Sequence, residues 1–149
     1  MLDLAHLHPM IVHFPLALMP LAVLLQAWIL FSGESPLGRS CSAYTALGLM
    51  IVAGLSALAA AGLGDVALDI AVDKGFPDAK MEDHEDLGFT TAWLMFGLAA
   101  LEAWLFWKNP TSRTPGVLVT LLGVGVMVLL LTTAWYGGNL VYGLGINVG

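Results

Sequence analysis

Apolar residues fill four long runs of the chain, and polar residues gather between the runs. The runs cover about residues 9–31, 43–64, 87–107 and 115–136. Each is long enough for the roughly 20 helical residues that cross a hydrocarbon core. Backbone groups in lipid must bond within the spanning structure, and the alternating polarity of a membrane barrel strand is absent. The pattern predicts an all-α fold, a four-helix transmembrane bundle with up-and-down topology, in a single integral membrane domain over residues 1–149.

Composition supports a membrane protein. The chain is 58% hydrophobic and only 11% charged, whereas soluble domains carry about 25% charged residues. Cys41 is the single cysteine, so neither an intrachain disulfide nor a thiolate cluster can form. No basic segment precedes the first run, and that run exceeds a signal peptide's apolar core, so we expect no cleaved leader. There is no basic patch that would bind nucleic acid.

The linkers differ in charge. The two short linkers, residues 32–42 and 108–114, carry Arg39, Lys108 and Arg113, and up-and-down topology places them on one side. The longer linker, residues 65–86, lies opposite with two lysines and eight carboxylates. Lysine and arginine favour the cytoplasmic side. We therefore expect a bacterial inner-membrane protein whose termini and acidic linker face outward.

Three local patterns refine the bundle. Within residues 65–75, aspartates repeat every four positions on one helical face and apolar residues lie on another, which predicts a short amphipathic helix on the membrane surface. Pro77 would lie near the first turn of the third helix. The glycines of residues 137–149 predict an irregular tail that folds back over the bundle. Glu102 lies about one turn from the cytoplasmic end, from where its side chain should reach the interface.

Small residues recur every four positions on the second and third runs, which favours close helix packing in lipid. Examples are Ala53, Ala57 and Ala61, then Ala60 and Gly64, then Ala99 and Ala103.

Every histidine maps to the side of the acidic linker. His6, His8 and His13 surround the start of the first run, and His84 precedes the third. These two helices run parallel, so His13 and His84 have similar depth and could face each other across the bundle. His6 is expected to be merely hydrated.

Prolines add space beside His13. Pro9 suits a first helical turn, but Pro15 and Pro20 each remove an internal hydrogen bond and favour a kink. Ionisable residues inside membranes are candidates for function.

Two kinds of centre suit these imidazoles. Axial histidines from different helices hold the iron of haem b, with His13 and His84 as ligands and His8 beside them. The alternative is a metal ion held by histidine plus carboxylate, with Asp65 as the oxygen donor.

Residues 8–18, HPMIVHFPLAL, and residues 137–149, GGNLVYGLGINVG, resemble the two ends of a bacterial membrane-protein family of unknown function. That family's patterns are HPxxVHFPIAL and GGxLVYxHGxGV. Its small-residue stretch ending in glycine and aspartate matches Gly64 and Asp65. The resemblance implies that His8, His13 and His84 are the family histidines, whereas Leu144 stands where the family has another histidine.

Relatives fused to Rieske-type domains imply membrane electron transfer, so a haem b redox carrier is our leading functional prediction. Its partners would be lipid, a membrane redox complex, a Rieske-type protein or a basic soluble electron carrier docking on the acidic linker. The alternatives are a non-catalytic subunit of a respiratory or photosynthetic complex and a metal-ion binding or transport protein. The helix surfaces are also compatible with a homo-oligomer. Nothing indicates hydrolytic chemistry, so we expect a carrier or subunit rather than an independent enzyme.

Overall fold

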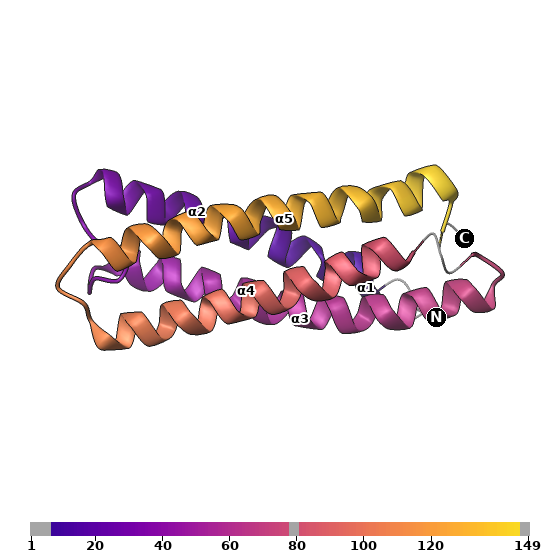
Figure 1. Ribbon diagram of the computed structural model, residues 1–149, viewed down its shortest axis with the longest axis horizontal. Coiled ribbons are helices and arrows are strands. Elements are labelled where there is room, and N and C mark those ends of the chain that lie inside the picture. Colours follow the sequence, from indigo (N-terminus) through magenta and orange to yellow (C-terminus); the bar gives the residue numbers. More distant parts are fainter. Residues whose placement is uncertain (1–6, 78–80, 147–149) are drawn as a thin grey trace.

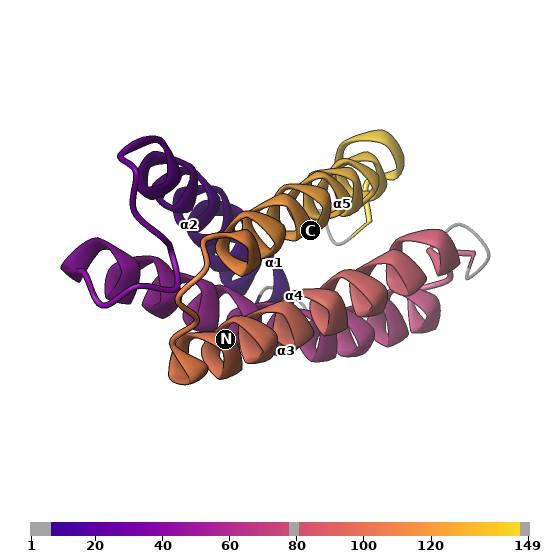
Figure 2. The same cartoon turned by 60° about the vertical axis from the view of Figure 1, so that its left-hand side comes forward.

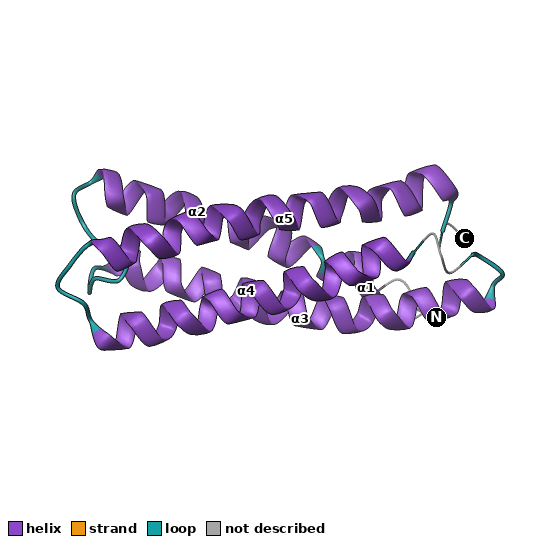
Figure 3. Ribbon diagram, in the orientation of Figure 1, coloured by secondary structure: helices purple, strands orange, loops and turns teal. Residues whose placement is uncertain are grey.

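The computed structural model describes residues 7–77 and 81–146, and this part of the chain is helical with short connections (Figures 1 and 3). The helices are α1 (Leu7–Ile11), α2 (His13–Phe31), α3 (Cys41–Asp73), α4 (Glu82–Lys108) and α5 (Thr114–Leu144). The first apolar run forms α1 and α2 together. Four helical segments in the described residues are therefore long and apolar enough to cross a membrane, as predicted.

The helices run up and down around one core (Figures 1 and 2). Helix α3 packs against α1, α2 and α4, and α5 closes the bundle against α4 and α2. The two short connections lie at one end, and the connection between α3 and α4 lies at the other, beside the start of α1 and the end of α5. Figure 2 shows α2 and α5 spreading apart, while α3 and α4 stay side by side.

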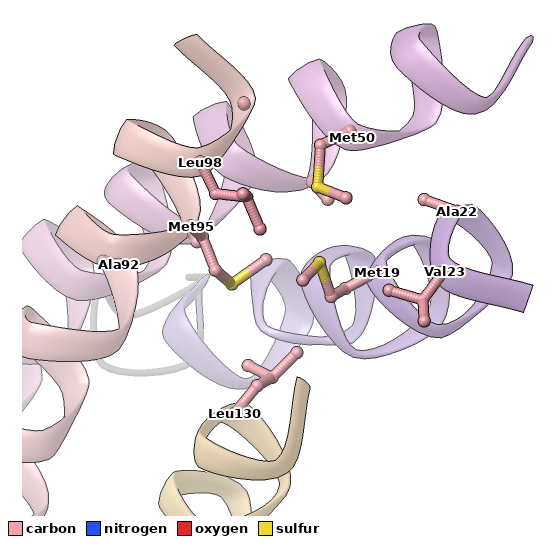
Figure 4. Close-up of a cluster of buried hydrophobic side chains, with 11 residues drawn as sticks. Met19, Ala22, Val23, Met50, Ala92, Met95, Leu98 and Leu130 are labelled. Atoms are coloured by element: carbon pink, nitrogen blue, oxygen red, sulfur yellow. The ribbon is translucent and has the colours of Figure 1, made fainter. Parts of the chain in front are cut away.

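The middle of the bundle is filled by methionine, leucine and alanine. Met19 of α2, Met95 of α4 and Leu130 of α5 point toward one another from three helices (Figure 4). Helices α3 and α4 approach closely at Gly54, where an added Cβ would lie 3.2 Å from the Met95 carbonyl oxygen. The expected small-residue packing is thus present, since a side chain at this position would push the two backbones apart.

The end with the short connections is tied together by Arg113. Its guanidinium donates to the carbonyl oxygens of Leu30, at 2.6 Å, and Glu34, at 3.2 Å. These carbonyls belong to the last turn of α2 and the linker after it, where helical partners are missing. Arg113 therefore stabilises the end of α2 from the start of α5.

Two helices are longer than predicted. The separate surface helix over residues 65–75 is wrong, because α3 continues without a break through Gly64 to Asp73. Ala67 and Ala71 are buried there, and Ala71 packs with Met81, Leu140 and Ile146, so tertiary packing extends the helix.

The irregular tail from residue 137 is also wrong, because α5 continues to Leu144. Gly145, with φ of 70°, ends the helix in the left-handed region that glycine adopts most readily. Ile146 then donates its N–H to the Leu140 carbonyl and is buried, so the fold-back occurs after residue 144. Residues 147–149 lie outside the described part.

Proline predictions were partly correct. Pro15 has no N–H, so the Ile11 carbonyl lacks its helical partner, but the helical path continues from α1 into α2, because Val12 donates to the His8 carbonyl and Leu16 donates to the Val12 carbonyl. Pro20 lies inside the continuous helix α2. Helix α4 begins at Glu82, so Pro77 lies before its first turn rather than in it.

Candidate functional site

His8 anchors the short helix α1 to α3. Its Nδ1 lies 2.8 Å from the carbonyl oxygen of Ala60, which fixes the tautomer with the proton on Nδ1. The ring reaches this carbonyl because the residue four positions later is Gly64. A Cβ at Gly64 would lie 3.0 Å from His8 Cε1, closer than side chains normally pack. The lone pair of His8 Nε2 is left for another partner.

His84 lies against α5 in the same way. The third residue of α4, it has the backbone of Thr133 as a hydrogen-bonding partner, and Gly137 follows Thr133 by four positions. A Cβ at Gly137 would lie only 2.7 Å from His84 Cε1. The Nδ1 atom of His84 is buried and has no hydrogen-bond partner. Such an atom is uncommon in folded proteins and points to a ligand or water.

The two imidazoles face one small pocket. Their ring centroids are 6.3 Å apart, and the ring planes meet at 81°. The pocket has a volume of about 30 Å³, and its walls include Asp65 and Glu85. Asp65 is exposed, and Glu85 is half-buried. Imidazole and carboxylate groups from α1, α3 and α4 therefore meet at the end of the bundle where the acidic linker lies.

This arrangement has the features of a metal site with two histidine ligands. In such sites one ring nitrogen binds the ion, while the other donates to a carbonyl or carboxylate that fixes the ring. Two metal–nitrogen bonds of about 2.0–2.1 Å plus the two ring radii span about 6.4 Å between centroids at a linear nitrogen–metal–nitrogen angle and about 5.2 Å at a tetrahedral angle. The observed 6.3 Å fits the wide angle, and a tetrahedral ion would draw the rings about 1 Å closer. No group of three His, Cys, Asp or Glu donors surrounds one point among residues 7–77 and 81–146. The other coordination positions would thus be open to water or to a carboxylate that moves.

A porphyrin does not fit this site. The donor set suits haem iron, which takes two axial imidazoles. However, the pocket of about 30 Å³ has room for a water molecule or a single ion, since a cavity of about 10–15 Å³ already holds one water. Haem b would require the two rings and their helices to move apart.

The structure pairs His84 with His8, where we had expected His13. His13 is exposed, and its Nδ1 bonds within its own helix to the Pro9 carbonyl. His8 and His13 are five residues apart, which is about 140° around a helix of 3.6 residues per turn, so only His8 packs against α3. Leu144 is the last residue of α5 and is 41% exposed, while His6 lies outside the described residues.

Sequence reasoning missed the function of Gly64 and Gly137. Each follows an accepting carbonyl by four residues, so its side chain would cover that carbonyl on the helix surface. The signal was present in the two motifs, a glycine before Asp65 and a glycine pair after Tyr136. Without the structure, neither glycine could be assigned to a particular histidine.

The expected position of Glu102 at the interface was also wrong. Its side chain is fully buried and accepts a hydrogen bond from Gln26, a residue that the sequence did not single out.

A comparison with protein families gives one match. The family model described as "Predicted membrane protein (DUF2231)" matches residues 5–149. No curated protein and no solved structure matches the chain.

Proposed function

Because the chain belongs to this family of predicted membrane proteins, whose description states no activity, we propose from the site that it is a membrane metal-binding protein. In this proposal His8 and His84 hold one transition-metal ion at the end of the bundle that carries the acidic linker. Imidazole suits zinc, copper, iron and nickel ions, and ion identity then depends on geometry and availability.

One observation carries the proposal. His84 Nδ1 is a buried nitrogen without a partner, and the neighbouring ring at 6.3 Å also has a nitrogen that its carbonyl contact leaves open. A buried polar atom without a partner costs about 1–3 kcal/mol. A bound ion would satisfy this atom and explain why both rings are fixed against carbonyls.

Nearby carboxylates suit a cation. Asp65 and Glu85 line the pocket, and acidic side chains raise the local concentration of cations. The basic residues of the short connections favour a cytoplasmic position for the opposite end. The site would then lie near the outer surface of a bacterial inner membrane, with both termini on that side.

Cys41 offers a test of this orientation, because it is exposed at the start of α3, beside a short connection. A membrane-impermeant thiol reagent should label Cys41 in inverted vesicles and not in intact spheroplasts. Labelling of Cys41 in intact spheroplasts would show that the protein has the opposite orientation.

Metal binding is tested by titrating Zn²⁺ and Cu²⁺ into the purified full-length protein. We expect one ion per chain, with affinity reduced at least tenfold by His8→Ala or His84→Ala. His13→Ala is the matched control, since that ring is exposed and bonds within its own helix, and it should leave affinity unchanged. Absence of binding, or equal binding by all three variants, would overturn the proposal.

Electron transfer through haem b is the second candidate. Two imidazoles meet among the described residues, and haem iron needs no third protein ligand, but a porphyrin requires these rings to move apart. A Rieske-type protein or a soluble carrier would be the partner in that case. The optical spectrum distinguishes the haem protein from the metal-ion-binding protein. Reconstitution with haem should give a low-spin b-type spectrum if His8 and His84 move apart to bind the iron, and no shift of the Soret band if they do not.

A further inference from the structure

A second polar site lies in the other half of the bundle, apart from the histidines. Gln26 of α2 and Glu102 of α4 are both fully buried. Gln26 Nε2 lies 2.9 Å from each carboxyl oxygen of Glu102. Glu102 comes six residues before the end of α4, which is about 9 Å along the helix axis.

No positive charge accompanies Glu102. The buried polar and charged residues in the described part of the chain are Gln26, Thr91, Glu102, Thr120 and Thr133. The buried positions of α3 and α5, which pack against α4, are apolar residues, glycines and threonines. Thr120 donates its hydroxyl to the Gly116 carbonyl within α5. An ionised Glu102 would therefore be an uncompensated charge in an apolar interior, which is very costly.

The amide oxygen of Gln26 presents a second problem. Gln26 Oε1 is buried and has no hydrogen-bond donor. It faces α5 at Gly123, where even an added Cβ would lie 4.0 Å away and could not donate. A buried carboxyl without a cation and a buried acceptor without a donor thus belong to the same pair of side chains.

We propose that Glu102 and Gln26 form an intramembrane proton site, in which Glu102 carries a proton and shares it with Gln26 Oε1. A protonated carboxyl has one O–H donor and retains acceptor capacity. Nε2 now faces both carboxyl oxygens, so a rotation of the amide plane would bring Oε1 beside the carboxyl group and allow two reciprocal hydrogen bonds, from the amide N–H to the carboxyl carbonyl and from the carboxyl O–H to the amide oxygen. If the nitrogen and oxygen of the Gln26 amide are exchanged, Oε1 faces the carboxyl oxygens directly. Two facing acceptors need a proton between them, so Glu102 must be protonated in this orientation as well.

This site is separate from the histidine pocket. Glu102 comes eighteen positions after His84 in α4, which is about 27 Å along the helix axis. Between these two residues, the buried polar side chain described in α4 is Thr91. Its hydroxyl is hydrogen-bonded to the Thr133 hydroxyl at 2.8 Å. The proton therefore exchanges at the end nearer to Glu102, and failure of metal binding would leave this proposal unaffected.

Infrared spectroscopy of the reconstituted protein tests the proposal. At neutral pH the wild type should show the C=O stretch of a protonated carboxyl group, and Glu102→Gln should remove it. Glu102→Gln keeps an amide donor toward Gln26, so the fold should be retained, as helical content and a monodisperse elution profile would show. Glu34→Gln, in an exposed linker position, is the matched control and should leave the band in place.

A second variant tests the partner. Gln26→Leu removes the acceptor while keeping a similar volume, so the C=O band should persist and move toward the frequency of a free acid. Absence of the band in the wild type at neutral pH would overturn the proposal. So would loss of the band on adding Na⁺ or K⁺, which would identify a cation site instead.

Discussion

Replacing Gly137 with alanine should disturb the histidine site through a single methyl group. The new Cβ would lie 2.7 Å from His84 Cε1 and 3.2 Å from Nε2. Ordinary contacts between carbon atoms are about 3.5–4.0 Å, so the ring or helix α5 must move by about 1 Å. Overpacking of this kind costs about 1–3 kcal/mol. Alanine itself favours the helix by about 0.8–1 kcal/mol relative to glycine, so the net loss of stability should be about 0–2 kcal/mol.

Gly138 provides the matched control for Gly137→Ala. It is the next residue of the same helix, and an added Cβ there meets nothing within 4 Å. Gly138→Ala should therefore stabilise the protein slightly, and the two variants should differ by about 1–3 kcal/mol. Thermal unfolding in detergent measures this difference, and ion titration should show a 10–100-fold weaker affinity for Gly137→Ala alone. Equal stability and equal affinity of the two variants would refute the contact between His84 and Gly137.

Three further changes follow from the packing. Gly64→Ala should displace the ring of His8 and weaken ion binding about 10–100-fold, whereas Gly62→Ala, where the added Cβ meets nothing within 4 Å, should not; equal titration curves would contradict this. Gly54→Ala should be less stable than Gly48→Ala by about 1–3 kcal/mol, because its Cβ would lie 3.3 Å from the Ala99 Cβ. Gly48→Ala, where the added Cβ meets nothing within 4 Å, is the control in the same thermal assay. Equal stability of the two variants would refute the close approach of α3 and α4 at Gly54. Arg113→Ala should cost about 1 kcal/mol by freeing the carbonyls at the end of α2, and unchanged unfolding would show that water replaces the guanidinium.

The fold could be predicted from the sequence because hydropathy and length are local properties. Four apolar runs in lipid allow few structures other than a helical bundle. Helix ends were less predictable, since the extensions of α3 and α5 depend on packing near Ala71 and Leu140 that no local pattern reveals. Glycine at residue 64 or 137 is compatible with both a helix end and a close contact, and only the neighbouring ring decides between them.

The sequence placed the histidines at the end of the bundle where the structure brings His8 and His84 together, but it paired His84 with His13, which the structure leaves exposed. Equal depth of the two helix starts correctly placed the histidine side, but depth does not determine which face a residue occupies. His8 and His13 lie about 140° apart around the helix, so His8 faces α3 while His13 is exposed. The pair of Gln26 and Glu102 was missed because a glutamine in an apolar run gives no indication of its partner 76 residues away.

Electron paramagnetic resonance of the protein loaded with one equivalent of Cu²⁺ tests the central claim most directly, because nitrogen splittings count the coordinated imidazoles. If His8 and His84 bind one ion, the wild type and His13→Ala should both show two nitrogen ligands, and His84→Ala should show one. A wild-type spectrum of free aqueous Cu²⁺, or one unchanged by His84→Ala, would contradict a metal centre between these two rings.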